Sequence, residues 1–262
     1  MTASRKPTVA VYKFSSCDGC QLGLLNLEDE LLDLVGLVEI AFFLEARRQV
    51  QPGPYDIGLV EGSVSTEEEV ERIKKIREEC GLLITIGTCA TAGGVQALRN
   101  FGNLEQLTDI VYQHPEYIHA LPHSTAVAEH VDVDLEIWGC PVNKYQVAEA
   151  IAALLQKRKP RLPEYSVCLE CKLQGNTCVL VANGTPCLGP ITRAGCGAIC
   201  PNMNRGCYGC FGPCPSAEIE AFAPVLKSLE RYPGEAVHLL RTISGNAPAF
   251  RQAAEIILDK EA

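Results

Sequence analysis

Short apolar runs alternate with helical patterns along the first 160 residues. Five such runs predict strands, at residues 8–14, 38–44, 56–61, 82–86 and 135–138. Residues 22–35 carry leucine and valine at three- and four-residue spacing (Leu24, Leu27, Leu31, Leu32 and Val35), which predicts one amphipathic helix. Residues 66–79 are expected to form a charged helix capped by Ser65 or Thr66, and residues 144–157 a further helix.

This alternation predicts an α/β fold, with an open parallel sheet covered by helices on both faces. In such sheets, ligands bind beyond the carboxyl ends of the strands, near the point where the strand order reverses. Cys17 and Cys20 follow the first predicted strand, Cys89 follows the fourth, and Cys140 follows the last. We therefore expect these four thiols to converge on one edge of the sheet.

A second domain is predicted after the basic, proline-broken run KRKPRLP at residues 157–163, which divides the chain into domains 1–160 and 161–262. Nine of the 14 cysteines lie within residues 168–214, among glycines and prolines and with hardly an apolar run. Such a segment cannot build a hydrophobic core of its own, so we expect a group bound to the sulfurs to hold it. Two terminal helices, at residues 217–231 and 247–260, are expected to pack against it.

Composition narrows the class of protein. The chain has 262 residues, of which 47% are hydrophobic, so it can bury a core. No apolar run approaches the roughly 18 residues of a membrane span, and the amino terminus lacks a signal-peptide pattern, so a cytoplasmic location is expected. Disulfides are disfavoured there, and cysteine pairs are more often ligands or catalysts. A net charge of −9, with no basic cluster beyond the short run at the domain boundary, argues against nucleic acid as a partner.

Spacing sorts twelve of the 14 cysteines into three groups of four. Group one contains Cys17, Cys20, Cys89 and Cys140; group two contains Cys168, Cys171, Cys178 and Cys187; group three contains Cys196, Cys200, Cys207 and Cys210. Cys80 and Cys214 are left over, and Cys214 competes with Cys200 for group three, where we favour Cys200. A thioredoxin-like dithiol at Cys17 and Cys20 is disfavoured, because it lacks the Trp and Pro neighbours of that motif and leaves Cys89 and Cys140 without a role.

Two metal chemistries suit these groups. Each group of four thiolates is a possible tetrahedral zinc site. Three such sites in one chain, flanked by glycines and small residues whose backbone N–H groups can approach sulfides, favour [4Fe–4S] clusters instead. Three clusters in one chain suggest an electron relay.

Several motifs occur together in this chain: the C-x2-C pair after the first strand, EGSVSTEEEVE after the third, GTCA, GCPV, CLEC, PCLGPITRAGC and CYGC. Their combination resembles the small subunit of [NiFe] hydrogenases, and the resemblance covers essentially the whole chain. It is strongest to the cytosolic bidirectional NAD(P)-linked type and to sulfhydrogenase delta subunits. In periplasmic members, a histidine stands at the position of Cys168 and the medial cluster often lacks the thiolate that Cys200 offers here.

The resemblance implies a flavodoxin-like first domain with a proximal [4Fe–4S] cluster on group one. It also implies an irregular second domain, with a distal cluster on group two and a medial cluster on group three. The chain would then be a non-catalytic electron-transfer subunit. Its expected partners are the large subunit, which holds the nickel site, together with diaphorase (flavin) and ferredoxin-like iron–sulfur subunits. The expected acceptor is NAD(P), sulfur or polysulfide.

From the residues, a zinc-stabilised, flavodoxin-like binding module without a redox role stays open as an alternative. The resemblance also extends to quinone-reducing complexes, which carry a one-cluster homologue of the first domain, but the second cysteine-rich domain speaks against such a partner. Glu61 ends the third predicted strand, and we interpret it as an exposed or capping carboxylate, with assistance to proton movement as the alternative.

Overall fold

The computed structural model describes residues 5–259. The chain divides into two compact units, with the boundary between Arg161 and Leu162. No helix within the described residues is long and apolar enough to cross a membrane.

The first unit is built on a five-stranded parallel sheet in the order β2-β1-β3-β4-β5. The strands are β1 (Thr8–Lys13), β2 (Glu39–Phe43), β3 (Tyr55–Glu61), β4 (Cys80–Ile86) and β5 (Leu135–Ile137). This is the flavodoxin-like order, in which the direction of sheet growth reverses between β1 and β3. The predicted α/β class and open parallel sheet are therefore confirmed.

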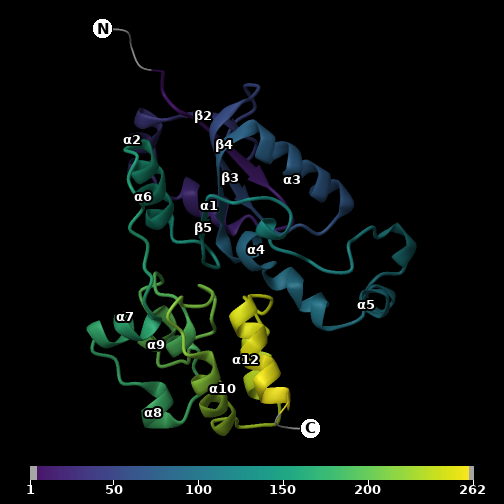
Figure 1. Cartoon of the computed structure of the whole chain (residues 1–262), viewed down its shortest axis with the longest axis vertical. Helices are drawn as coiled ribbons and strands as arrows, with labels where there is room; N and C mark the ends of the chain where they lie inside the picture. Colours follow the sequence, from purple (N-terminus) through teal and green to yellow (C-terminus); the bar gives the residue numbers. More distant parts are fainter. Residues whose placement is uncertain (1–4, 260–262) are drawn as a thin grey trace. The chain divides into compact units, whose positions relative to one another are not determined.

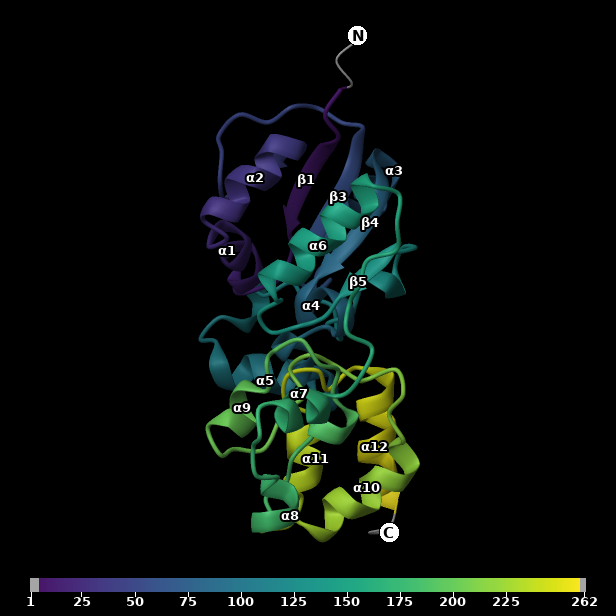
Figure 2. The ribbon, with the colours of Figure 1, turned by 90° about the vertical axis from the view of Figure 1, so that its left-hand side faces the viewer.

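Helices cover both faces of this sheet (Figures 1 and 2). On one face lie α1 (Gly19–Leu25), α2 (Asp29–Leu37) and α6 (Lys144–Leu155), and on the other α3 (Glu67–Glu79) and α4 (Gly87–Ala92). The central strands β1 and β3 are buried along almost their whole length. A strand covered on both faces reads as a continuous apolar run, which explains why the sequence pattern located these strands.

The single helix expected at residues 22–35 is wrong, because the segment forms α1 and α2 with a break between them. The break lies at Asn26, which ends α1, and Glu28, whose φ of 54° is left-handed. Leu27, which lies between the two helices, is 1% exposed and belongs to the core. The apolar face of the single predicted helix is therefore interrupted at this residue. Leu32 and Val35, assigned to the buried face, are exposed on α2.

The helix at α3 begins as expected, with Thr66 accepting a hydrogen bond from the backbone N–H of Glu69 at 3.2 Å.

Between α4 and β5, the chain forms short helical segments. They are the 3₁₀ helix η1 (Val95–Phe101), helix α5 (Leu104–Val111), and the 3₁₀ turns η2 (Pro115–Tyr117) and η3 (Val127–Glu129). Asn103 begins α5 by accepting the backbone N–H of Gln106 at 3.0 Å.

The second unit carries its cysteines on short helices and loops and closes with longer helices. The short elements are α7 (Val167–Leu173), α8 (Val179–Asn183), η4 (Gly189–Ile191) and α9 (Ile199–Asn202). Three helices follow, α10 (Ile219–Ser228), α11 (Glu235–Leu240) and α12 (Pro248–Asp259), one more than expected. Leu188 and Ile191 of the cysteine segment pack in one core with Leu226, Leu240 and Phe250 of the helices. The cysteine segment therefore rests on a shared apolar core, in addition to anything that its sulfurs bind.

Candidate metal centres

Three loops of the first unit meet at the carboxyl edge of its sheet. The backbone N–H of Thr88, at the start of α4, donates to the carbonyl oxygen of Gly139 after β5 at 2.8 Å. The backbone N–H of Val142 donates to Sγ of Cys20 at 3.4 Å. A Cβ placed on Gly87 would lie 2.3 Å from the same sulfur. The thiol that follows β1 therefore touches both the β4 and the β5 loops.

The other thiols of group one lie beside Cys20. The pKa of the Cys89 thiol is raised to about 11, mainly by burial and in smaller part by its neighbours Cys140 and Cys17. Burial likewise raises the pKa of Cys140, again with Cys17 nearby. The structure thus brings all four side chains of group one to one edge of the sheet. Their role as ligands stays a prediction.

Glu61 is the last residue of β3. Its side chain binds the backbone of the Cys17–Cys20 loop, which follows the neighbouring strand β1. Its carboxylate accepts the backbone N–H groups of Cys20 at 3.0 Å and Gln21 at 3.2 Å, in the first turn of α1. The residue is only 2% exposed. Burial raises the pKa of Glu61, and the two N–H bonds act in the opposite direction. The exposed interpretation is therefore wrong, and the carboxylate caps α1.

Gly94 and Gln96 lie beside Cys89, and the spacing of the cysteines indicates neither of them. A Cβ on Gly94 would lie 2.5 Å from Sγ of Cys89, so only glycine leaves the sulfur its space. Gln96 accepts a hydrogen bond from this thiol through Oε1 at 3.5 Å and donates from Nε2 to the carbonyl of Ser15 at 2.5 Å. Gln96 therefore joins the β1 and β4 loops. Nothing in the local sequence beyond the Gly93–Gly94 pair points to this contact.

Group two also converges, around Gly189 in the second unit. A Cβ on Gly189 would lie 3.3 Å from Sγ of Cys187 and 3.4 Å from Sγ of Cys168. Burial raises the pKa of the Cys168 thiol to about 11, with further contributions from the thiols of Cys187, Cys171 and Cys178. The four side chains predicted as group two are therefore neighbours.

Group three appears in the structure as two pairs. The thiols of Cys196 and Cys200 interact with each other, and so do those of Cys207 and Cys210. The second pair borders group two, because the backbone N–H of Cys207 donates to Sγ of Cys187 at 3.1 Å.

The two cysteines outside the groups have other surroundings. The Cys214 thiol donates to the carbonyl oxygen of Glu164 at 3.3 Å and lies 3.3 Å from the hydroxyl of Ser216. Cys80 begins β4, at the end of the strand opposite to the carboxyl edge, and is 4% exposed. It packs so closely on β3 that a Cβ on Gly58 would lie 2.5 Å from its sulfur.

The donor sets of groups one and two fit iron–sulfur clusters. A [4Fe–4S] cluster is held by four cysteine thiolates, and groups one and two each supply four neighbouring thiols. The glycines at positions 87 and 94 leave open space beside two of these sulfurs. All 14 cysteines are free of disulfides. Across residues 5–259, no group of three or more Cys, His, Asp or Glu side chains is arranged to hold a single metal ion.

Comparison with known proteins identifies the family. Residues 17–154 match the family of the 20 kDa subunit of NADH ubiquinone oxidoreductase. The chain is 38% identical, over 221 residues, to the delta subunit of sulfhydrogenase 2 from Pyrococcus furiosus, covering 84% of this chain and 92% of that protein. It is 26% identical, over 257 residues, to the iron–sulfur subunit of an F420-non-reducing hydrogenase from Archaeoglobus profundus, covering 76% of this chain and 80% of that protein.

A solved structure agrees with these relatives. A chain of an NAD⁺-reducing [NiFe]-hydrogenase in the H₂-reduced state superposes with a TM-score of 0.56 at 27% identity, covering 61% of this chain and 96% of that chain. The chain therefore belongs to the family of the 20 kDa subunit of NADH ubiquinone oxidoreductase, and within it to the small subunits of [NiFe] hydrogenases. The resemblance indicated by the cysteine motifs is confirmed, and the chain is a hydrogenase subunit.

Proposed function

We propose that the chain carries electrons between the NiFe centre of a large subunit and a diaphorase module, through three [4Fe–4S] clusters. Bound clusters would supply one-electron carriers whose potentials depend on hydrogen bonds, charge and solvent exposure. The protein's own part is to hold the thiolates, to shape the backbone around them and to exclude water. The assignment of the first unit, residues 1–160, to the proximal cluster and of residues 161–262 to the other two belongs to this proposal.

One observation carries the proposal most directly. In a chain of the hydrogenase family, Cys17, Cys20, Cys89 and Cys140 come together at the carboxyl edge of a flavodoxin-like sheet. This is the place where open parallel sheets bind their ligands. Glu61 fixes the backbone of the Cys17–Cys20 loop through the N–H of Cys20, and Gln96 binds the carbonyl oxygen of Ser15 in the same loop region. Hydrogen bonds of this kind orient metal ligands and tune the metal they hold.

In the second unit we propose a distal cluster on group two and a medial cluster on group three. The convergence of group two around Gly189 supports the distal assignment. For the medial cluster we retain Cys200 as the fourth ligand. Its thiol interacts with that of Cys196, whereas the thiol of Cys214 is engaged with Glu164 and Ser216.

The names of two relatives support the partners and the acceptor that we propose. One relative is a sulfhydrogenase subunit, and one related structure is an NAD⁺-reducing hydrogenase. We therefore propose a large subunit with the nickel site, diaphorase (flavin) and ferredoxin-like subunits, and NAD(P), sulfur or polysulfide as acceptor. A cytoplasmic location belongs to the same proposal.

Metal and sulfide analysis tests the proposal against a zinc-stabilised module. Three cubane clusters correspond to about twelve iron and twelve acid-labile sulfide per chain. We expect this content in anaerobically purified chain, together with hydrogen-dependent reduction of an acceptor by the assembled complex. A colourless chain that holds only zinc would refute the relay.

The exposed side of α1 provides a test of the partner. Leu22 is 54% exposed on the helix that follows the Cys17–Cys20 loop, and Leu25 is half-buried. If the group-one edge faces the large subunit, Leu22→Asp should reduce co-purification of that subunit at least about tenfold, because the interface would bury a charge. Iron content should stay unchanged. Leu258→Asp on α12 is the control, and unaltered co-purification of both variants would contradict the interface.

A further inference from the structure

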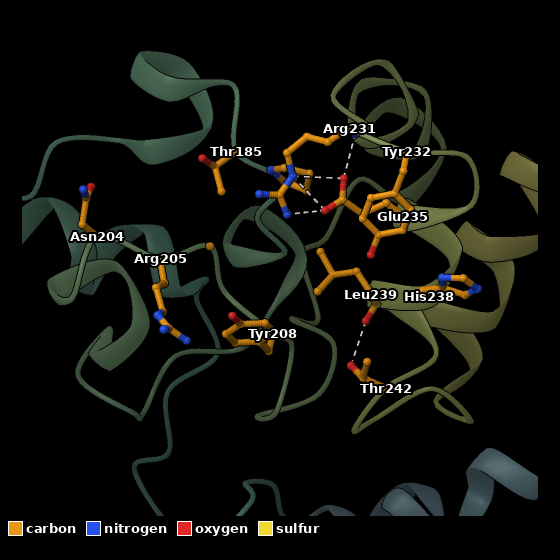
Figure 3. Close-up of a pocket in the computed structure, with 12 residues that line it drawn as sticks. Thr185, Asn204, Arg205, Tyr208, Arg231, Tyr232, Glu235, His238, Leu239 and Thr242 are labelled. Atoms are coloured by element: carbon orange, nitrogen blue, oxygen red, sulfur yellow. Dashed lines mark hydrogen bonds and ion pairs between the residues drawn. The ribbon is translucent and has the colours of Figure 1, made fainter.

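The second unit contains a cavity of about 480 Å³ between the cysteine segment and α11 (Figure 3). One wall is formed by residues 185–186 and 204–208, and the other by residues 231–242. Small-molecule sites typically have volumes of roughly 300–1,000 Å³. The cavity therefore has the size of a site for a small organic ligand, and its lining shows which chemistry that ligand should have.

Arg231 is held in one wall by Glu235. Its backbone N–H and its Nε donate to the Glu235 carboxylate at 2.8 and 2.9 Å, and Nη2 donates as well. The Glu235 side chain is 6% exposed, whereas that of Arg231 is 64% exposed. Hydrogen bonds from Arg231 lower the pKa of Glu235, so the carboxylate stays charged and its charge is balanced by the guanidinium. The pair thus fixes a guanidinium at the cavity without leaving net negative charge.

Arg205 supplies a second guanidinium from the opposite wall, where it extends toward Tyr208 (Figure 3). Within residues 5–259, its side chain forms no hydrogen bond or ion pair with another side chain or the backbone. The cavity therefore carries a net positive charge, in a chain whose formal net charge is −9. Such a local excess of positive charge favours an anionic ligand, and guanidinium groups bind phosphate and carboxylate oxygens in a bidentate manner.

Two tyrosines add flat apolar surface to the same cavity. Tyr208 is 40% exposed and Tyr232 is 53% exposed, although both line the cavity. Aromatic rings pack favourably against other planar groups, by offset stacking or edge to face. A ligand with a planar ring would cover these exposed faces while its anionic end meets the guanidinium groups.

We infer that this cavity binds a small organic anion in which a planar ring is joined to a phosphate or carboxylate, the chemistry of a nucleoside monophosphate. Arg205 binds the anionic group, Arg231 contributes only the guanidinium N–H groups that Glu235 leaves free, and Tyr208 and Tyr232 pack on the ring. The inference concerns binding alone and does not depend on the cluster assignment.

The position of the cavity gives such a ligand a direct contact with the cysteine segment. Pro186 and Gly206 line it, and each directly precedes a proposed cluster ligand, Cys187 or Cys207. The two segments touch there, since a Cβ on Gly206 would lie 2.0 Å from the carbonyl oxygen of Pro186.

Calorimetric titration of AMP into the full-length, anaerobically purified chain tests the inference. We expect saturable binding at one site per chain. Adenosine lacks the anion and inorganic phosphate lacks the ring, so each should bind at least about tenfold more weakly, which corresponds to about 1.4 kcal/mol. Absence of saturable AMP binding would overturn the inference, and so would equal affinity for either of the two partial probes.

Variants locate the binding site. Arg205→Ala and Tyr208→Ala should each weaken AMP binding at least about tenfold, and Arg205→Lys should weaken it less because it keeps the charge. Both residues are exposed, so the melting temperature should stay unchanged. Arg251→Ala, an exposed arginine on α12 outside the cavity, is the matched control. Wild-type affinity in both alanine variants would show that AMP binds elsewhere.

Discussion

Cys89→Ser is expected to lower the iron content by about four per chain, from about twelve to about eight, and to reduce hydrogen-driven acceptor reduction to background. Cys89 lies in the first turn of α4, beside Cys140 and Cys17. Serine offers a harder and far less acidic ligand than cysteine, so the proposed proximal cluster loses one of its four thiolates. Electrons from the large subunit would then lack their first carrier. Iron analysis of the purified variant and a hydrogen-dependent dye-reduction assay of the complex measure the two effects.

Cys80→Ser is the matched control for this variant. Cys80 is also buried in the first unit, but it begins β4 at the end opposite to the carboxyl edge. The variant should keep about twelve iron and full turnover, with a loss of stability of about 1–3 kcal/mol from the buried hydroxyl. If Cys89→Ser retained the iron and turnover of Cys80→Ser, the assignment of group one would be wrong.

The sheet was predictable because its strands are covered on both faces. Buried parallel strands read as short continuous apolar runs, and each of the five observed strands begins and ends within two residues of such a run. The convergence of Cys17, Cys20, Cys89 and Cys140 then followed from topology, since the carboxyl ends of parallel strands share one edge. Neither step required knowledge of side-chain contacts.

Other features depend on contacts that sequence periodicity does not encode. The break between α1 and α2 arises because Leu27 turns into the core, although the leucine spacing continues through it. Gln96 reaches Ser15 across 81 positions of the chain, and Glu61 caps a helix that begins on another strand's loop. Such contacts can be identified only when the three-dimensional positions of the loops are known. In the second unit, the sequence pattern located the cysteines and predicted that terminal helices pack against them, but it did not show that Leu188 and Ile191 of the cysteine segment belong to the shared core.

A substitution at Gly87 has two effects that can be measured separately, one on the backbone conformation and one on the proposed cluster. Its φ of 83° is left-handed, which costs a residue with a side chain about 1–2 kcal/mol. A Cβ there would also lie 2.3 Å from Sγ of Cys20 and 3.3 Å from the carbonyl oxygen of Gly139. A free thiol can rotate away from that Cβ, whereas a sulfur bound to iron is held in place. The conflict is therefore more severe in the loaded protein than in the empty chain.

Gly87→Ala is consequently expected to lose about four iron per chain, while its free energy of unfolding falls by only about 1–2 kcal/mol. Gly184→Ala is the control, because Gly184 has a similar φ of 61° and no atom within 4 Å of the added Cβ. It should show the same backbone cost and keep its full iron content. Iron analysis and denaturant unfolding of both variants separate the two effects. Full iron content in Gly87→Ala would mean that Cys20 is not fixed by a metal, and the proximal assignment would then lose its central ligand.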